Sequence, residues 1–215
     1  MLEMKREGMQ GPITFDQLGT IRNGWLKEAI GEIDPNRPHD AMKPVGIINH
    51  FTCSYNARGT IEWFKNESVS IHFIVDKNGD IYQMTPCEQI AYHAGLSSWK
   101  QWTGLNKHFI GIEFVNLGPL EVKGGKFVDC YGREFKGKYH TFEFDGYKYW
   151  EQFSDEQMKV MYWLNKTLMT HYHIDLGNVV AHHEVSPKRK NDVGGSIGMT
   201  MGEFRKNLSL WVPQK

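Results

Sequence analysis

Residues 108–117, HFIGIEFVNL, form a mostly apolar run of residues that favour β-strands. Such a run is typical of a central strand that other elements cover on both faces. Glu113 interrupts the run, and burying an ionised carboxylate without a partner is strongly unfavourable. The run therefore predicts a central strand in which Glu113 has either a partner or a chemical role.

Three further segments predict strands of the same sheet. VGIINHFT (residues 45–52) and NVVAHH (residues 178–183) are apolar runs that end in polar side chains. SVSIHFIVDKNGDIYQM (residues 68–84) has two strand-favouring halves around Asn78-Gly79, a pair that favours the positive φ values of a tight turn. The last segment therefore predicts a hairpin.

Helical patterns lie between and after these strands. FSDEQMKVMYWLNKTLMTHYHI (residues 153–174) opens with Ser154 and Gln157 as a capping box and continues with apolar residues at helical spacing. TFDQLGTIRNGWLKEAIGEI (residues 14–33) predicts an N-terminal helix, and MGEFRKNLSLW (residues 201–211) predicts a C-terminal one. Strands interleaved with helices predict a single α/β domain with a central mixed β-sheet flanked by helices.

The chain divides into a short N-terminal part and a main domain. Residues 1–44 form the N-terminal helical segment and a proline-containing connector, and residues 45–215 form the main domain. Within that domain, residues 117–150 are rich in glycine, lysine and aromatic residues without a helical period. We expect a long loop or hairpin insertion there.

The composition indicates a soluble protein that folds. Of the 215 residues, 40% are hydrophobic and 23% are charged, and the 25 basic side chains balance the 25 acidic ones. This balance gives no positive field to attract nucleic acid, so we expect no nucleic-acid partner. No segment resembles a signal peptide or a membrane span, so we expect synthesis in the cytoplasm and no membrane insertion.

The cysteines predict free thiols. Cys53, Cys87 and Cys130 cannot all pair and have no CxxC spacing, which argues against a disulfide framework. Cys53 follows His50 by three residues and could serve as a soft metal ligand, although a small buried thiol is the commoner role.

Three segments end predicted strands with unusual side chains: His50, Glu113 and the stretch AHHEVSPKRKNDVG at residues 181–194. Ligand sites collect at strand ends and in the loops that follow them. A hydrolytic zinc site needs about three ligands of the His, Asp, Glu or Cys type and an open position for water. Three converging strand ends would supply such a site.

His50, His182 and Asp192 form one possible ligand set. Glu113 could then accept the proton of the attacking water, and Lys190 could stabilise the oxyanion formed from an amide carbonyl. Each residue also has an ordinary interpretation. A single histidine at a strand end is more often a polar cap, and the PKRK sequence around Lys190 suits a solvated basic loop.

The adjacent histidines of the last stretch are not equivalent. If the strand continues through both, His182 and His183 point to opposite faces, so only one of them should reach a metal. Spacing alone does not choose between them.

Six blocks in sequence resemble the zinc-dependent N-acetylmuramoyl-L-alanine amidases of the type-2 amidase and peptidoglycan-recognition family, which includes phage lysins. The resemblance runs from about Val45 to Phe204. The matching blocks are INHFT, SIHFIVDKNGDIYQMTP, AYHAG, IGIEFVN, YWEQFSDEQ and HHEVSPKRKNDVG. Residues 45–215 would therefore be the amidase catalytic domain.

This resemblance implies a Zn²⁺ cofactor and a role for each matched residue. Counting back from Pro187 in the last block selects His182 over His183 as the metal ligand, together with His50 and Asp192. It also implies that Glu113 is the catalytic acid or base and that Lys190 assists it. The chain departs from the family pattern at Ala181, Lys188 and Val193, which alters the loop more than the ligand chemistry.

Two more histidines match the family with less defined roles. His93 in AYHAG resembles a histidine that lines the substrate groove, and His72 in SIHF resembles one that is mainly structural. We treat both as candidate substrate-binding residues. A packed, hydrogen-bonded neutral histidine is the alternative for each.

The resemblance implies hydrolysis of the amide bond between N-acetylmuramic acid and L-alanine in peptidoglycan or muropeptides. The alternatives are a non-catalytic peptidoglycan-binding module, which would not need stoichiometric zinc, and a metal-dependent nuclease, which the charge balance argues against. The insertion favours a lysin that acts on the cell wall over a cytoplasmic recycling enzyme. A monomer is favoured, although the oligomeric state stays open.

Overall fold

A computed structural model describes residues 15–32 and 40–213, which contain one mixed six-stranded sheet. Its strands are, in spatial order, β14 (Val179–Ala181), β4 (Gly46–Phe51), β9 (Phe109–Phe114), β5 (Phe73–Val75), β6 (Ile81–Gln83) and β3 (Ile30–Gly31). β14, β4, β9 and β5 run parallel, and β6 is antiparallel to β5. The predicted central strand, its neighbours and the hairpin are confirmed.

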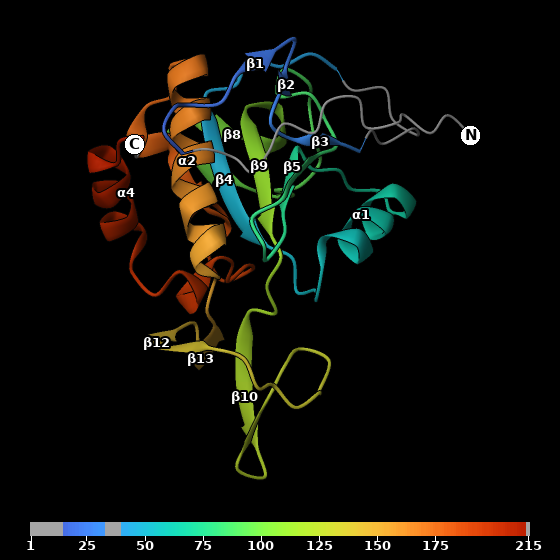
Figure 1. Ribbon diagram of the computed structural model, residues 1–215, viewed down its shortest axis with the longest axis vertical. Coiled ribbons are helices and arrows are strands. Elements are labelled where there is room, and N and C mark those ends of the chain that lie inside the picture. The colour runs from blue at the N-terminus through green and yellow to red at the C-terminus, as the bar shows by residue number, and fades with distance from the viewer. Residues whose placement is uncertain (1–14, 33–39, 214–215) are drawn as a thin grey trace.

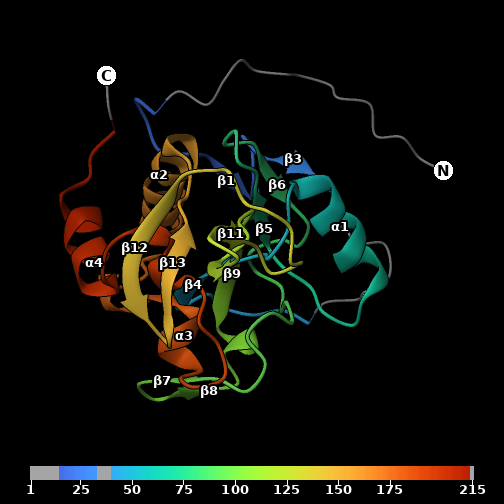
Figure 2. The ribbon, with the colours of Figure 1, turned by 90° about the horizontal axis from the view of Figure 1, so that it is seen from below.

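Helices cover both faces of this sheet. α2 (Asp155–Tyr172) and α4 (Met201–Leu210) lie on one side and α1 (Ala57–Asn66) on the other (Figure 2). The predicted capping box of α2 is present, and α2 packs its apolar face on the main core. The single α/β domain with a central mixed sheet flanked by helices is therefore confirmed, although the sequence analysis did not predict α1.

A buried amide pair joins α2 to β4 beside the candidate site. Asn165 donates to the Asn49 side-chain oxygen (3.0 Å), and Asn49 donates to the Asn165 oxygen (3.3 Å) and to the Val180 carbonyl (3.3 Å). Both side chains are buried. Since Asn49 and His50 are adjacent in β4, their side chains point to opposite faces of the sheet. The Asn49–Asn165 pair therefore holds β4 in place from the face opposite to His50.

Replacing Asn165 with alanine should therefore destabilise the fold. The Asn49 side-chain oxygen would lose the donor that Asn165 supplies. Leaving a buried acceptor without a partner costs about 1–3 kcal/mol, and thermal unfolding should shift down by about 3–10 °C. Lys159→Ala, at an exposed position of the same helix, is the matched control. Differential scanning calorimetry checks this, and equal melting temperatures for the two variants would show that the pair is not structural.

The predicted helix over residues 14–33 is wrong for its described part. Residues 15–32 instead contain β1 (Ile21–Arg22) and β2 (Trp25–Leu26), an antiparallel hairpin, followed by β3. Asn23 and Gly24 have φ values of 51° and 76°, the left-handed pair that a two-residue hairpin turn requires. The Asn-Gly turn signal thus overrode the helical spacing, and β3 joins the main sheet. Most of the connector, residues 34–39, lies outside the described residues.

The insertion at residues 117–150 folds as a second sheet. It has four antiparallel strands, β11 (Lys126–Val128), β10 (Pro119–Lys123), β13 (Tyr147–Glu151) and β12 (Tyr139–Phe144), in that spatial order. The hairpin form of the prediction is therefore confirmed. The second sheet projects from the edge where β9 ends, below the main sheet in Figure 1. It consequently stands beside the carboxyl ends of the parallel strands.

Shorter elements complete the described chain: β7 (Ser98–Trp99), β8 (Trp102–Thr103), α3 (His182–Val185) and the 3₁₀ turns Leu105–Lys107, Leu176–Asn178 and Gly194–Ile197. Within the described residues, no helix combines the length and apolarity needed to cross a bilayer.

The prediction of three free thiols is wrong for two of them. Cys53, in the loop after β4, forms a disulfide with Cys130 in the insertion, whereas Cys87 is a free buried thiol. The bonded cysteines are 77 residues apart in sequence, and only the folded insertion brings them together. Because Cys53 is in the disulfide, it cannot replace Asp192 as a metal ligand.

Candidate metal centre

Three side chains from separate elements converge at the carboxyl ends of the parallel strands. His50 lies near the end of β4, His182 begins α3 directly after β14, and Asp192 is in the following loop. His50 Nδ1 lies 2.9 Å from His182 Nδ1, and Asp192 Oδ2 lies 3.0 Å from each of these nitrogens. All three residues are buried. They are the group among the described residues that could hold a metal ion.

Hydrogen bonds on the far side of the rings determine which nitrogens carry protons. His93 Nε2 faces the Phe109 carbonyl at 3.1 Å and must donate to it, so neutral His93 presents Nδ1 as an acceptor. His50 Nε2 donates to that atom at 2.9 Å, and His182 Nε2 donates to the Ala94 carbonyl at 3.1 Å. In the neutral rings, both Nδ1 atoms therefore carry lone pairs that point at Asp192.

Three electron-pair donors at this separation fit a shared cation. Ligand atoms about 2.0–2.1 Å from a tetrahedral Zn²⁺ lie about 3.3 Å from one another. The observed separations of 2.9–3.0 Å are close to this value. Because none of the three donors brings a proton to the others, a cation relieves their mutual repulsion. The residues present thus fit the predicted metal.

The electrostatics of the group favour the forms that bind metal. Burial, with a smaller effect of His182, lowers the pKa of His50 to about 4. Burial also holds the pKa of His93 well below its usual value. Burial alone would raise the pKa of Asp192, but its contacts with His182 and His50 bring that pKa below the usual range. His50 is therefore neutral and Asp192 ionised at neutral pH, as metal ligands must be.

Gly111 makes room for the ring that orients His50. A Cβ atom at this position of β9 would lie 2.6 Å from Cγ of His93 and 2.6 Å from the Ile71 side chain. The missing side chain therefore lets His93 pack against the sheet beneath His50. Orientation of a ligand ring by a second hydrogen-bonded residue is a general feature of metal sites.

Glu113 lies directly beside this group. The parallel register of β4 and β9 pairs Glu113 with His50, so both side chains point to the same face of the sheet. Its Oε2 is buried, and no described residue hydrogen-bonds to that atom. Burial, reinforced by the charge of Asp192 and opposed by Lys190, raises the pKa of Glu113 to about 8. Such a carboxyl group can exchange a proton near neutral pH.

The candidate metal centre lies in a cleft of about 780 Å³. His50, Glu113, His182 and Asp192 lie on its wall, and Lys190 is an exposed residue of the same wall. Lys190 is close enough for its charge to affect the pKa values of both His50 and Glu113. The structure thus brings the five predicted catalytic and metal-binding residues into one cleft.

The remaining sequence candidates occupy different places. His93 lines the cleft through its contact with His50. His72 is buried and is not part of the cleft wall: its Nε2 donates to the Gln89 carbonyl and its Nδ1 accepts the Gly111 amide. This arrangement suits the structural role more than substrate contact.

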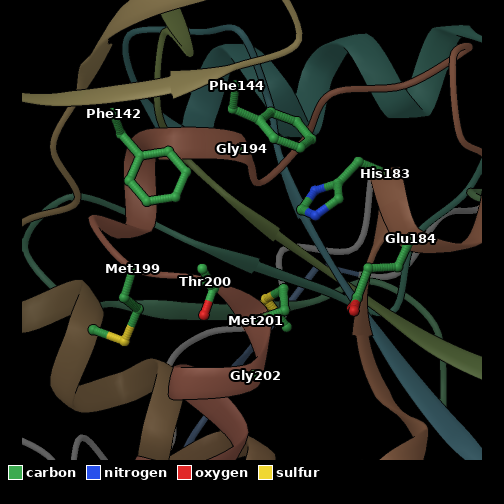
Figure 3. A pocket seen from close by; sticks show the side chains of 9 residues that line it. All are labelled: Phe142, Phe144, His183, Glu184, Gly194, Met199, Thr200, Met201 and Gly202. Carbon is green, nitrogen blue, oxygen red and sulfur yellow. The ribbon is translucent and has the colours of Figure 1, made fainter.

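His183 points away from the candidate centre, as expected for the second histidine. Its ring lies in a separate pocket of about 250 Å³, beside Phe144 with ring centroids 4.6 Å apart (Figure 3). Its backbone N–H and Nδ1 both contact the Asp192 carbonyl, at 2.8 Å and 3.1 Å. His183 therefore braces the loop that carries Asp192. The reason for its direction differs from the prediction, because β14 ends at Ala181 and the two histidines lie on a helical turn.

Two supporting contacts were missed by the sequence analysis. Arg189 donates to the carbonyls of Ala94 (2.6 Å) and Leu96 (2.9 Å), which ties the basic loop to the segment that His182 contacts. Glu184 forms a two-fold ion pair with Arg205 of α4, with both N–O distances 2.9 Å. Arg189 lies in the PKRK sequence that suited a solvated loop, so sequence alone concealed its role.

Comparison with known proteins identifies the family. The family model described as N-acetylmuramoyl-L-alanine amidase matches residues 40–195, well over half of the chain. The chain belongs to this family. The matched range includes every residue of the candidate metal centre together with Glu113 and Lys190. The resemblance stated from sequence is confirmed.

Individual relatives support this assignment. N-acetylmuramoyl-L-alanine amidase AmiD of Escherichia coli K12 is 29% identical over 172 residues, which cover 76% of this chain and 54% of AmiD. The chain thus matches about half the length of that relative. A solved structure of E. coli AmiD in complex with the substrate anhydro-N-acetylmuramic acid-L-Ala-D-γ-Glu-L-Lys is 25% identical, with a TM-score of 0.58, over 81% of this chain and 61% of that one.

The fold also matches a crystal structure of a selenomethionine derivative of AmpD. The TM-score is 0.60 at 20% identity, and the match covers 87% of this chain and 98% of that one. At this level of identity the likeness concerns the fold alone.

Proposed function

We propose that this amidase-family chain hydrolyses the amide bond between the lactyl group of N-acetylmuramic acid and the L-alanine of the peptidoglycan stem peptide. The observation that carries the proposal is the convergence of His50, His182 and Asp192 beside Glu113, whose Oε2 has no hydrogen-bond partner among the described residues. Membership of the amidase family supports this reaction, and the structure of the AmiD relative is a complex with a substrate of this type.

Within this proposal, His50, His182 and Asp192 hold Zn²⁺. When bound, the ion supplies Lewis-acid chemistry that makes water nucleophilic at neutral pH. The ring of His93 keeps His50 in the tautomer that offers its Nδ1 lone pair. With these three residues as ligands, the site would match catalytic zinc sites, which use three protein ligands and also bind water.

The protein's own groups then move the protons and stabilise charge. Glu113 takes a proton from water as the water oxygen bonds to the amide carbonyl carbon. The ammonium group of Lys190 stabilises the negative charge that develops on the carbonyl oxygen. When the carbon–nitrogen bond breaks, Glu113 returns the proton to the departing nitrogen, which becomes the free amino group of L-alanine.

Digestion of purified peptidoglycan tests this function. Zinc-loaded protein should release new L-alanine amino termini, measured by amine labelling and mass spectrometry, while the number of glycan reducing ends stays constant. New amino termini on another residue would indicate an endopeptidase, and new reducing ends would indicate a glycosidase. Either result, or no cleavage of sacculi and soluble muropeptides alike, would contradict the proposal.

A further inference from the structure

Two tyrosines stack on each other in the wall of the cleft. Tyr55 lies in the loop after β4 and Tyr131 in the insertion, with ring centroids 5.5 Å apart and planes inclined by 23°. Both line the cleft that contains the candidate metal centre, and they are 40% and 55% exposed. We call this pair the tyrosine platform. It leaves a large apolar surface open within the cleft.

The platform is fixed in place from both segments. The disulfide between Cys53 and Cys130 joins the two loops directly beside the rings. The Tyr131 hydroxyl donates to the Cys53 carbonyl at 2.6 Å, and the Tyr55 hydroxyl donates to the Asp129 carboxylate. Both hydroxyl groups are therefore engaged within the protein. The platform offers ring surface to a ligand, and binding it needs little further ordering.

Charge is distributed unevenly along the same cleft. The cations Lys188, Arg189 and Lys190 come from the loop that follows α3. Beside the platform, Asp129 accepts the backbone N–H of Arg133, and the Arg133 guanidinium lies 5.3 Å and 5.8 Å from the ring centroids of Tyr55 and Tyr131. The charge of Asp129 therefore offsets the charge of this cation. An anionic peptide is therefore attracted to the basic loop, whereas the platform suits an uncharged ligand with apolar faces.

We infer that the tyrosine platform is a glycan subsite, an inference that rests on the proposed function. Sugar rings present C–H faces that pack against aromatic rings, whereas stem-peptide carboxylates need cations. The amide bond to be cleaved joins the sugar, N-acetylmuramic acid, to the stem peptide. A cleft with an aromatic region, a cationic region and the candidate centre fits a substrate that spans all three.

The inference assigns a role to the insertion. Figure 2 shows β11 and the chain after it lying between α1 and the β12–β13 pair, over the end of the main sheet. The insertion thus adds Tyr131 to a cleft that the main sheet begins. A glycan strand, which extends beyond a single muramic acid, gains more from this surface than a soluble muropeptide does.

Steady-state kinetics on two substrates test the subsite. Tyr131→Ala should lower kcat/KM for uncrosslinked peptidoglycan strands by about tenfold, mainly through KM, because a well-packed aromatic contact contributes about that much. For N-acetylmuramoyl tripeptide the loss should be about twofold or less. Tyr131→Phe keeps the ring and should retain most activity on strands. Val122→Ala, at an exposed position of β10 outside the cleft wall, controls for changes in the insertion.

Binding of peptide-free glycan strands separates this inference from the proposed function. Protein that binds the strands and loses about tenfold in affinity with Tyr131→Ala or Cys130→Ser supports the subsite even if no amide is cleaved. Wild-type protein that cleaves muropeptides without binding the strands overturns the subsite and leaves the function intact. Equal kinetic losses on both substrates would also overturn it, since they would indicate a general structural defect.

Discussion

Replacing Glu113 with glutamine should reduce the rate of L-alanine release by about 10²–10⁴-fold, the usual contribution of a positioned acid or base. Glutamine has nearly the same size and can still occupy the space beside His50, but its amide cannot accept and return a proton. No hydrogen bond joins Glu113 Oε2 to the described residues, so the substitution breaks no such bond there. The loss should therefore appear in kcat with little change in KM.

Zinc content and melting temperature of the Glu113→Gln variant test whether its lower activity comes instead from lost zinc or a destabilised fold. Glu113 is not in the group of potential ligands, so Glu113→Gln should keep stoichiometric zinc and the wild-type melting temperature. Glu156→Gln, at an exposed position in the first turn of α2, is the matched control and should be fully active. Full activity in Glu113→Gln would remove Glu113 from the mechanism.

The parts of the fold that the sequence predicted are those with a local periodic signal. A window of about twenty residues contains the whole signal for each of three elements: the strand around Glu113, the capped helix that begins after Ser154 and the hairpin around Gly79. Parallel strands then place their ends at one edge, which is why His50 and Glu113 could be expected in one site. Register itself could not be predicted, although the pairing of these two residues depends on it.

The parts that the sequence did not predict depend on contacts between distant segments. Nothing around Cys53 indicates a partner 77 residues away, and an odd cysteine count suggests free thiols. Arg189 looks like a solvated cation until the segment at Ala94 packs against it. At residues 15–32, two signals competed, and the turn preference of Asn23-Gly24 prevailed because the hairpin's continuation, β3, pairs with β6.

Removing a ligand of the candidate centre should have the second large effect. We expect wild-type protein to contain one zinc ion per chain and His182→Ala to contain almost none. At zinc concentrations about 1,000 times the dissociation constant, binding stabilises the folded state by about 4 kcal/mol. That corresponds to a rise in melting temperature of about 8–16 °C for a chain of this size. The rise should be absent in His182→Ala.

Comparing wild-type protein with His182→Ala also distinguishes a zinc-dependent enzyme from a non-catalytic peptidoglycan-binding module. His171→Ala, at an exposed position of α2, is the matched control and should bind zinc and cleave like the wild type. Chelation should abolish amide cleavage by the wild type, and added Zn²⁺ should restore it. The Nδ1 atoms of His50 and His182 and the Asp192 carboxylate lie 2.9–3.0 Å apart, so these ligands need no rearrangement to bind the ion. The prediction would be contradicted if zinc did not change the melting temperature of the wild type, or if His182→Ala bound zinc as tightly as the wild type. Either result would show that these three atoms do not form a metal site.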